Sequence, residues 1–176
     1  REVGDALAEC GQGDLAAYAY RAAAEIRPDV RTWVALGRVL HQSGDLAASN
    51  QAYTAALKMD PAHLAARLNL GWNCYLQGDY ARAIELNRQV LADQESLGAL
   101  CNLGLARLAA GDRAAGERCY ADAVARFGVA EIEKAGAVQD LRELAARDLA
   151  AGNLAARDLT ARDLTTRPDA PDGARS

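Results

Sequence analysis

Residues 30–63 have the sequence VRTWVALGRVLHQSGDLAASNQAYTAALKMDPAH, and this stretch decides the fold. Gly37 lacks a side chain where the two helices of a hairpin would approach most closely. Gly44-Asp45 lets the chain turn before the aspartate caps a second helix, and the proline of Asp60-Pro61 ends the unit. The stretch therefore predicts a helix–turn–helix hairpin.

The same glycine motifs recur along the chain at nearly constant intervals. Gly-Asp begins at positions 13, 44, 78 and 111, at intervals of 31, 34 and 33 residues, and Leu-Gly precedes the last three pairs. A period near 34 residues predicts a helical solenoid. Because the first interval is the shortest, we expect the second helix after Gly13-Asp14 to be two residues shorter than normal. The first helix before it is expected to be reduced to Val3, Leu7 and Cys10.

These motifs resemble the tetratricopeptide repeat, whose pattern places Trp, Leu-Gly, Gly-Asp, Tyr, Ala and Pro at fixed positions. The copy at residues 30–63 carries Trp33, Leu36, Gly37, Leu40, Gly44, Asp45, Leu46, Tyr53, Ala56 and Pro61. The resemblance implies an all-α fold in which helical hairpins stack into a right-handed superhelix and first helices line a concave groove. It covers residues 1–128, with a degenerate first repeat at 1–29 and further repeats at 30–63, 64–96 and 97–128.

The repeats depart from the family pattern at several positions. Ser49 stands where the family prefers alanine, and Arg67 takes the place of the tryptophan in repeat 64–96. In the last unit, Arg113 and Gly116 replace the expected apolar residue and alanine. The last unit therefore follows the family pattern more loosely.

The segment after the repeats is expected to end the solenoid. Apolar residues between Ile132 and Leu144 predict a capping helix over residues 129–150. Leucine then recurs every five residues in an Arg-Asp-Leu tail at 151–176, which resembles the pentapeptide-repeat motif of square β-helices. Because that motif would bury unpaired arginines, a polar helix or a partly disordered low-complexity tail is favoured over a β-helix.

Composition excludes several classes of protein. The chain has 176 residues, 51% hydrophobic but only 5% aromatic, and a net charge of -4. An all-β fold, a membrane span and a nucleic-acid partner are not expected. Four widely spaced cysteines, Cys10, Cys74, Cys101 and Cys119, are expected to be buried thiols of a cytoplasmic protein, with disulfides as the weaker alternative. Arg1 opens the sequence, which leaves open whether a signal peptide or further domains preceded it.

The sequence contains no catalytic constellation. His41 and His63 are the two histidines, and neither has the spacing of a metal site or a catalytic triad. Glu131 and Glu133 are expected on a solvated helix start. We therefore expect no enzymatic activity, no bound metal and no cofactor.

The resemblance also implies which residues contact a partner peptide, because one face of each first helix borders the groove in the family. The matching positions give the candidate peptide-binding residues Arg38, His41, Leu68, Asn69, Trp72, Tyr75, Cys101, Asn102 and Leu105. Asn69 and Asn102 share a repeat position and resemble an asparagine ladder that clamps an extended peptide backbone. Hydrogen bonding to a neighbouring helix is the alternative for both.

Two further features of this face have competing interpretations. Trp72 and Tyr75 lie three residues apart, so they form either an aromatic wall for a ligand or a contact between hairpins. Arg31, Arg38 and His41 favour an acidic peptide at one end of the groove, although a solvated face explains them nearly as well.

The fold predicts an interaction scaffold that binds a peptide or helix of a partner protein in the concave groove. One alternative is a regulatory or recruitment domain of a larger enzyme or signalling protein. Another is a structural module that self-associates through its first hairpin or its tail. Family members that bind the carboxyl-terminal end of heat-shock chaperones need five polar positions, of which only Asn69 matches well. A co-chaperone role is therefore not expected.

Overall fold

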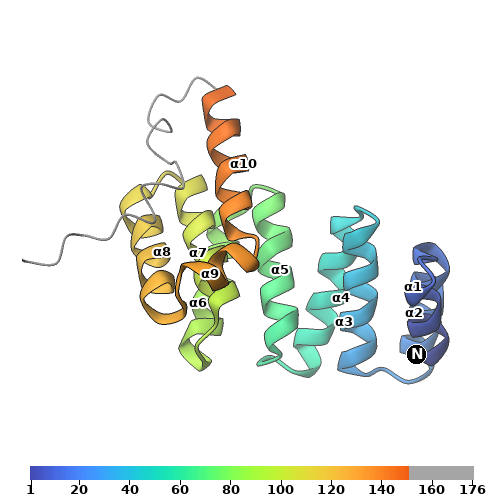
Figure 1. Cartoon of the computed structure of the whole chain (residues 1–176). Helices are drawn as coiled ribbons and strands as arrows, with labels where there is room; N and C mark the ends of the chain where they lie inside the picture. Colours follow the sequence, from blue (N-terminus) through green and yellow to red (C-terminus); the bar gives the residue numbers. More distant parts are fainter. Residues whose placement is uncertain (151–176) are drawn as a thin grey trace, which may run out of the picture.

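The computed structural model describes residues 1–150, and every regular element in that range is an α-helix (Figure 1). The helices are α1 (Glu2–Glu9), α2 (Gly13–Ile26), α3 (Val30–Gln42), α4 (Leu46–Met59), α5 (Leu64–Leu76), α6 (Tyr80–Asp93), α7 (Leu97–Ala109), α8 (Arg113–Phe127), α9 (Val129–Lys134) and α10 (Ala137–Ala150). The expected low-complexity tail at 151–176 lies outside the described residues.

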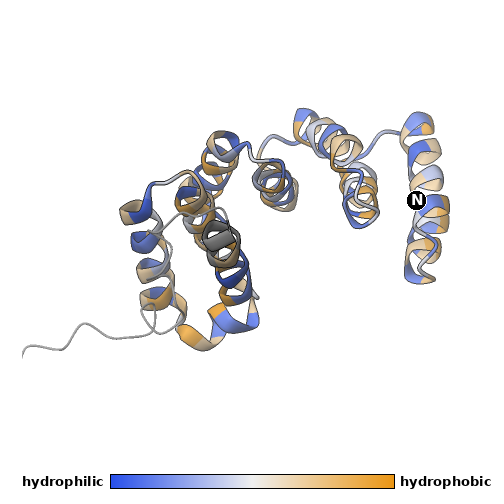
Figure 2. Cartoon of the chain, turned by 90° about the horizontal axis from the view of Figure 1, so that it is seen from above, coloured by the Kyte–Doolittle hydropathy of each residue, from blue (hydrophilic) through white to orange (hydrophobic). Residues whose placement is uncertain are grey.

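The first eight helices form four stacked hairpins, α1–α2, α3–α4, α5–α6 and α7–α8. Each second helix packs against the first helix of the next hairpin. The first helices α3, α5 and α7 also contact one another in series, so they form the inner, concave side of the arc that Figure 2 shows. This arrangement confirms the all-α fold of stacked hairpins.

A tyrosine packed on a glycine closes three of the four hairpins. A Cβ atom on Gly4, Gly37 or Gly104 would lie 2.6–2.7 Å from the ring of a tyrosine 16 residues later. These tyrosines, Tyr20, Tyr53 and Tyr120, are among the largest fully buried or nearly buried side chains. The two helices therefore cross at the glycine, where only a hydrogen atom leaves room for the ring.

The hairpin α5–α6 differs, because Asn87 takes the place of the tyrosine opposite Gly71. The buried Asn87 amide donates from Nδ2 to the Ala83 carbonyl oxygen at 2.8 Å. Within the described residues its Oδ1 atom has no hydrogen-bond partner. This hairpin therefore contains a buried polar group that costs stability.

The turn of the first hairpin lies two residues earlier than the Gly13-Asp14 motif predicts. Gly11 adopts a positive φ of 72°, as Gly44 does at 83°, whereas Gly13 is already the first residue of α2. The helix α2 has 14 residues, as α4 and α6 do, so the prediction of a shortened second helix was wrong. The left-handed conformation at Gly11 sets the register, and Gln12 provides no side-chain cap.

The first helix of that hairpin is short. α1 has 8 residues, whereas α3, α5 and α7 each have 13. Its Val3 side chain is 67% exposed, whereas Leu36 of α3 is buried in a cluster with residues of α2.

Cysteine burial follows the helix pattern with one exception. Cys74, Cys101 and Cys119 are buried, and all four cysteines are free thiols. The prediction of a buried thiol was wrong for Cys10, which is exposed where α1 ends.

The departure at Arg67 has a structural explanation. Its side chain is only 14% exposed and forms an ion pair with Asp93. Its Nε atom donates to the Pro61 carbonyl oxygen at 2.7 Å. Arg67 therefore connects the turn before α5 to the end of α6, in the place of a tryptophan.

Two helices, α9 and α10, replace the single capping helix expected at 129–150. Gly128 and Gly136 have φ values of 82° and 80° and redirect the chain before and after α9. α9 packs against α8, and α10 then packs against α7 and α9. The chain therefore turns back toward the concave face at Gly136 (Figure 1).

Candidate functional site

The candidate binding surface is the concave face formed by the first helices. Arg38, Trp72 and Leu105 occupy equivalent positions on α3, α5 and α7, yet their surroundings differ. We call Arg31, Val34, Ala35 and Arg38 on α3 the open half of this face. We call Trp72, Tyr75, Cys101, Leu105 and Leu108 on α5 and α7 the covered half.

The covered half lies beneath α10. Ala137, Leu141 and Leu144 of α10 are buried in one apolar cluster with Tyr75, Cys101, Leu105 and Leu108. As a result, Tyr75, Cys101 and Leu105 are only 8%, 5% and 1% exposed. Three of the nine candidate peptide-binding residues are therefore buried in the same cluster as α10.

The aromatic residues of the covered half pack on one another. The Trp72 and Tyr75 rings are stacked, with centroids 5.2 Å apart and planes inclined by 25°. Tyr75 also contacts Tyr80 at the start of α6, with ring centroids 5.8 Å apart. A cavity of about 200 Å³ lies beside these rings, between α5 and α10. It is lined by Trp72, Tyr75, Leu76, Asp140, Glu143 and Leu144.

Burial changes the pKa of two groups where α10 meets the covered half, Asp140 on α10 and Cys101 on α7. Burial of Asp140, together with the neighbouring negative charge of Glu143, raises the pKa of the Asp140 carboxyl above its usual value. Burial raises the pKa of Cys101 to about 11, with smaller contributions from Asp140 and Cys119. The Cys101 thiol is therefore protonated at neutral pH and weakly nucleophilic.

The open half is polar and accessible. Arg31 and Arg38 are exposed, and Val34 and Ala35 are half-buried. Neither arginine forms an ion pair with any side chain that the structure describes, in residues 1–144 and 146. The open half therefore presents positive charge that the described part of the chain does not compensate.

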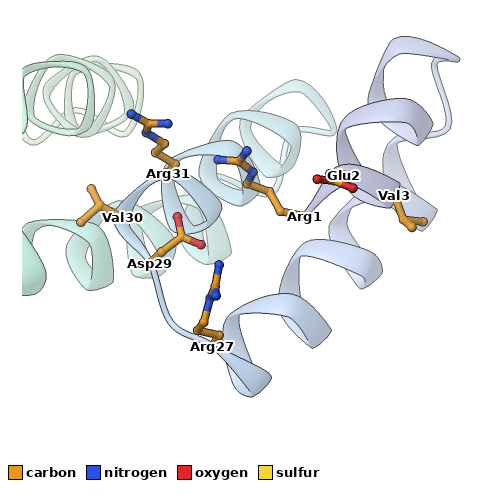
Figure 3. A pocket seen from close by; sticks show the side chains of 7 residues that line it. All are labelled: Arg1, Glu2, Val3, Arg27, Asp29, Val30 and Arg31. Carbon is orange, nitrogen blue, oxygen red and sulfur yellow. The ribbon is translucent and has the colours of Figure 1, made fainter.

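An open pocket of about 680 Å³ adjoins this surface where α1 meets the start of α3 (Figure 3). It is lined by Arg1, Glu2, Val3, Arg27, Asp29, Val30 and Arg31. The Asp29 carboxylate is already engaged, because it caps α3 by accepting from the backbone N–H of Thr32 at 2.9 Å and from the Thr32 hydroxyl. These hydrogen bonds hold the pKa of Asp29 below its usual value.

His41 belongs to a polar network between repeats. Asn73 donates both amide hydrogens, to Ser49 Oγ at 2.8 Å and to Asn50 Oδ1 at 2.9 Å. Its Oδ1 atom therefore accepts from His41 Nδ1 at 2.6 Å, which places a hydrogen on that ring nitrogen. Ser49 in turn donates to the Gly37 carbonyl oxygen at 2.7 Å.

Sequence reasoning missed Asn73 as the centre of this network. The signal was the departure at Ser49, because a hydroxyl in a buried alanine position needs a hydrogen-bond partner. One ring nitrogen of His41 is thus committed to holding α3 and α5 together.

The two candidate ladder asparagines are both half-buried but differ in their partners. Burial raises the pKa of Tyr53, and the neighbouring polar side chains of Ser49 and Asn69 partly offset that shift. Asn69 therefore already reaches the neighbouring hairpin. The side chain of Asn102 forms no hydrogen bond with another residue in the range 1–150. Leu68, the remaining candidate, is half-buried on α5.

No group of three or more His, Cys, Asp or Glu side chains among residues 1–150 is placed to hold a metal ion. No helix in this range has the length and apolar character needed to cross a membrane.

The chain is similar to tetratricopeptide repeat proteins in part of its sequence and in its fold. A family model described as tetratricopeptide repeat matches residues 34–96. The chain is similar to the crystal structure of MamA, with a TM-score of 0.71 and 18% sequence identity, over 89% of this chain and 88% of that chain. It is also similar to TTC0263, a thermophilic tetratricopeptide repeat protein of Thermus thermophilus, with a TM-score of 0.61 and 20% identity, over 93% and 92% of the two chains. No curated protein sequence gives a significant match.

Proposed function

Because the chain is a tetratricopeptide repeat protein, we propose that it is a scaffold that binds a segment of a partner protein on its concave face. Tetratricopeptide domains generally serve as protein-interaction modules. In this proposal the chain supplies a binding surface and performs no catalysis of its own.

The observation that carries the proposal is the positive charge of the open half. Arg31 and Arg38 lie on the same accessible helix face and have no ion-pair partner among the described side chains. Two cations on a rigid surface favour a ligand with matching negative charges, and they increase its association rate. The partner segment is therefore acidic where it crosses α3.

Further candidates extend the proposed surface along the groove. Leu68 and Asn69 on α5 lie next to the open half and supply an apolar contact and an amide. Asn102 on α7 has an uncommitted amide that can bond a peptide backbone. His41 offers one ring nitrogen, because the other is committed to Asn73.

A peptide selection tests this proposal. A phage-displayed random peptide library selected against the full chain is expected to yield peptides rich in Asp and Glu. One selected peptide is then synthesised and titrated by fluorescence anisotropy. We expect Arg31→Glu/Arg38→Glu to weaken its binding at least about tenfold. Asn69→Ala/Asn102→Ala is expected to weaken it less, because amide contacts are uncharged.

The matched control is Arg88→Glu/Arg118→Glu, which changes the net charge equally at exposed positions on the second helices α6 and α8. This variant is expected to bind within about twofold of the wild type. Selected peptides without an acidic excess, or equal losses in both charge-reversed variants, would rule out the open half as the binding surface.

A further inference from the structure

A helix of the chain itself lies on the covered half of the concave face. α10 leaves the stack at Gly136 and packs back against α7. Its buried side chains Ala137, Leu141 and Leu144 have the spacing i, i+4 and i+7, so they form one apolar stripe along the helix. The covered half is thus a seat for an amphipathic helix.

The seating of α10 differs from that of the repeat helices. α3, α5 and α7 each pack against the second helix that precedes them, within a continuous stack. α10 instead packs against α7 and α9 (Figure 1). A cavity beside Trp72 lies between α10 and α5. α10 is therefore laid onto the concave face and does not extend the stack.

The fit between α10 and its seat is incomplete. The cavity of about 200 Å³ remains between the aromatic pair of α5 and the α10 residues Asp140, Glu143 and Leu144. Two carboxylates therefore border an apolar surface, where Asp140 is partly desolvated and repelled by Glu143. Gly128 and Gly136 flank α9 with positive φ values, so the segment that carries α10 is attached through two glycine turns.

We propose that α10 is a displaceable occupant of the covered half, and that this half binds an amphipathic helix of a partner protein in its place. The partner helix carries apolar side chains with the spacing of Ala137, Leu141 and Leu144. This inference rests on the proposed function, because displacement of α10 regulates binding only if the concave face is the binding surface.

In this exchange a partner helix replaces α10 and covers the same apolar side chains. Release of α10 alone would expose Tyr75, Cys101 and Leu105, which is unfavourable. A partner helix with the same stripe covers them again, as amphipathic helices do in hydrophobic grooves. The apparent affinity for the partner is lowered by the fraction of molecules in which α10 is seated, so α10 limits binding.

The test uses the full chain and a peptide of known sequence. Leu141→Asp/Leu144→Asp removes the stripe of α10 but leaves the covered half unchanged. The probe is a fluorescent synthetic peptide with the sequence of residues 137–150, AVQDLRELAARDLA. We expect this peptide to bind the variant at least about tenfold more tightly than the wild type. The same peptide with aspartate in place of the leucines at positions 141 and 144 is expected not to bind.

A matched control keeps the test specific to the stripe. Gln139→Asp/Arg142→Asp places two aspartates on the exposed face of the same helix. This control is expected to bind the probe as weakly as the wild type does.

Cys101 supplies a readout that needs no ligand. Its thiol is buried in the cluster that α10 completes. Alkylation by N-ethylmaleimide, located by mass spectrometry, is expected to be at least about tenfold faster at Cys101 in the Leu141→Asp/Leu144→Asp variant than in the wild type. Cys74 and Cys119 are expected to keep their wild-type rates, and the added probe peptide should slow Cys101 again.

Three results would overturn the inference. The first is a folded variant in which the alkylation rate of Cys101 is unchanged. The second is a folded variant that does not bind the probe peptide. The third is loss of the whole fold, with all buried thiols reacting. The last result would make α10 an integral part of the solenoid. Hydrogen exchange of the wild type checks the same point without a variant, because a displaceable α10 exchanges its amides faster than α7 does. None of these measurements involves Arg31 or Arg38, so the proposed acidic-peptide site is tested separately.

Discussion

The open and covered halves of the concave face use equivalent positions of the same repeat but have opposite character. Arg38 stands exposed on α3, whereas its counterpart Leu105 on α7 is 1% exposed beneath α10. The open half keeps its charges in water, and the covered half keeps its apolar side chains out of it. The comparison shows that one scaffold can present two different surfaces, because the residue at an equivalent first-helix position is exposed in one repeat and buried in another.

The largest difference between the halves is expected in stability. Leu105→Ala should lower the free energy of unfolding by about 2–5 kcal/mol, because it leaves a cavity in the cluster that contains α10. Arg38→Ala, at the equivalent position, should change it by no more than about 0.5 kcal/mol. Urea unfolding followed by circular dichroism measures both. Similar losses in the two variants would contradict the division of the face.

A second prediction concerns the hydrogen bonds of Asn73, which connect α5 to α3 and α4. Asn73→Ala should cost about 1–3 kcal/mol, because it leaves Ser49 and His41 without their buried hydrogen-bond partner. Asn50→Ala removes a member of the same network that is only half-buried, so it should cost less. Both are compared by thermal unfolding. Equal costs would mean that burial of Asn73 does not decide the contribution of the network.

A third test compares two glycines of α7 that differ only in what lies beside them. A Cβ atom on Gly104 would lie 2.7 Å from the Tyr120 ring, whereas a Cβ on Gly98 would meet nothing within 4 Å. Gly104→Ala should therefore destabilise the fold by about 1–3 kcal/mol. Gly98→Ala should stabilise it by up to about 1 kcal/mol, because alanine favours the helix. Unfolding shifts of the same sign would show that the close approach to Tyr120 is not limiting.

The smallest effect on stability is expected from the charge of Asp140 on α10. The pKa of Asp140 is raised in the folded protein, so its carboxylate form opposes folding and stability falls as pH rises above the ordinary pKa of Asp. Asp140→Asn should therefore raise stability at pH 7. It should have no effect near pH 3, where the Asp140 carboxyl of the wild type is protonated and as neutral as the asparagine of the variant. Cys101 and Tyr120, which lie in the same cluster, do not titrate in this range, because burial raises the pKa of each. A pH-independent difference in urea midpoints would refute this assignment.

The sequence predicted the hairpins well where a motif has one local cause. The close helix approach at Gly37 and the Asp45, Asp79 and Asp112 caps each depend on residues within one repeat, and the structure confirms them. It predicted the first turn wrongly, because Gly11 and Gly13 are both compatible with a turn by composition. Only the backbone conformation distinguishes them, and Gly11 has the positive φ.

The candidate binding residues were predicted less completely. Their positions on the first helices follow from the repeat, but the cover over Tyr75, Cys101 and Leu105 does not. It depends on a turn at Gly136 and on contacts between α10 and α7 that are distant in sequence. Asn73 was missed for the same reason, since its three partners come from α3 and α4.

The sequence by itself determined the repeat period, the helical hairpins and the residues that face the groove, because these depend on spacing within a unit of about 34 residues. Only the tertiary structure decided which part of the groove is accessible. That outcome depends on where the chain after the last repeat packs, and the apolar stripe of α10 finds its partner on α7 and not on the next position in the stack.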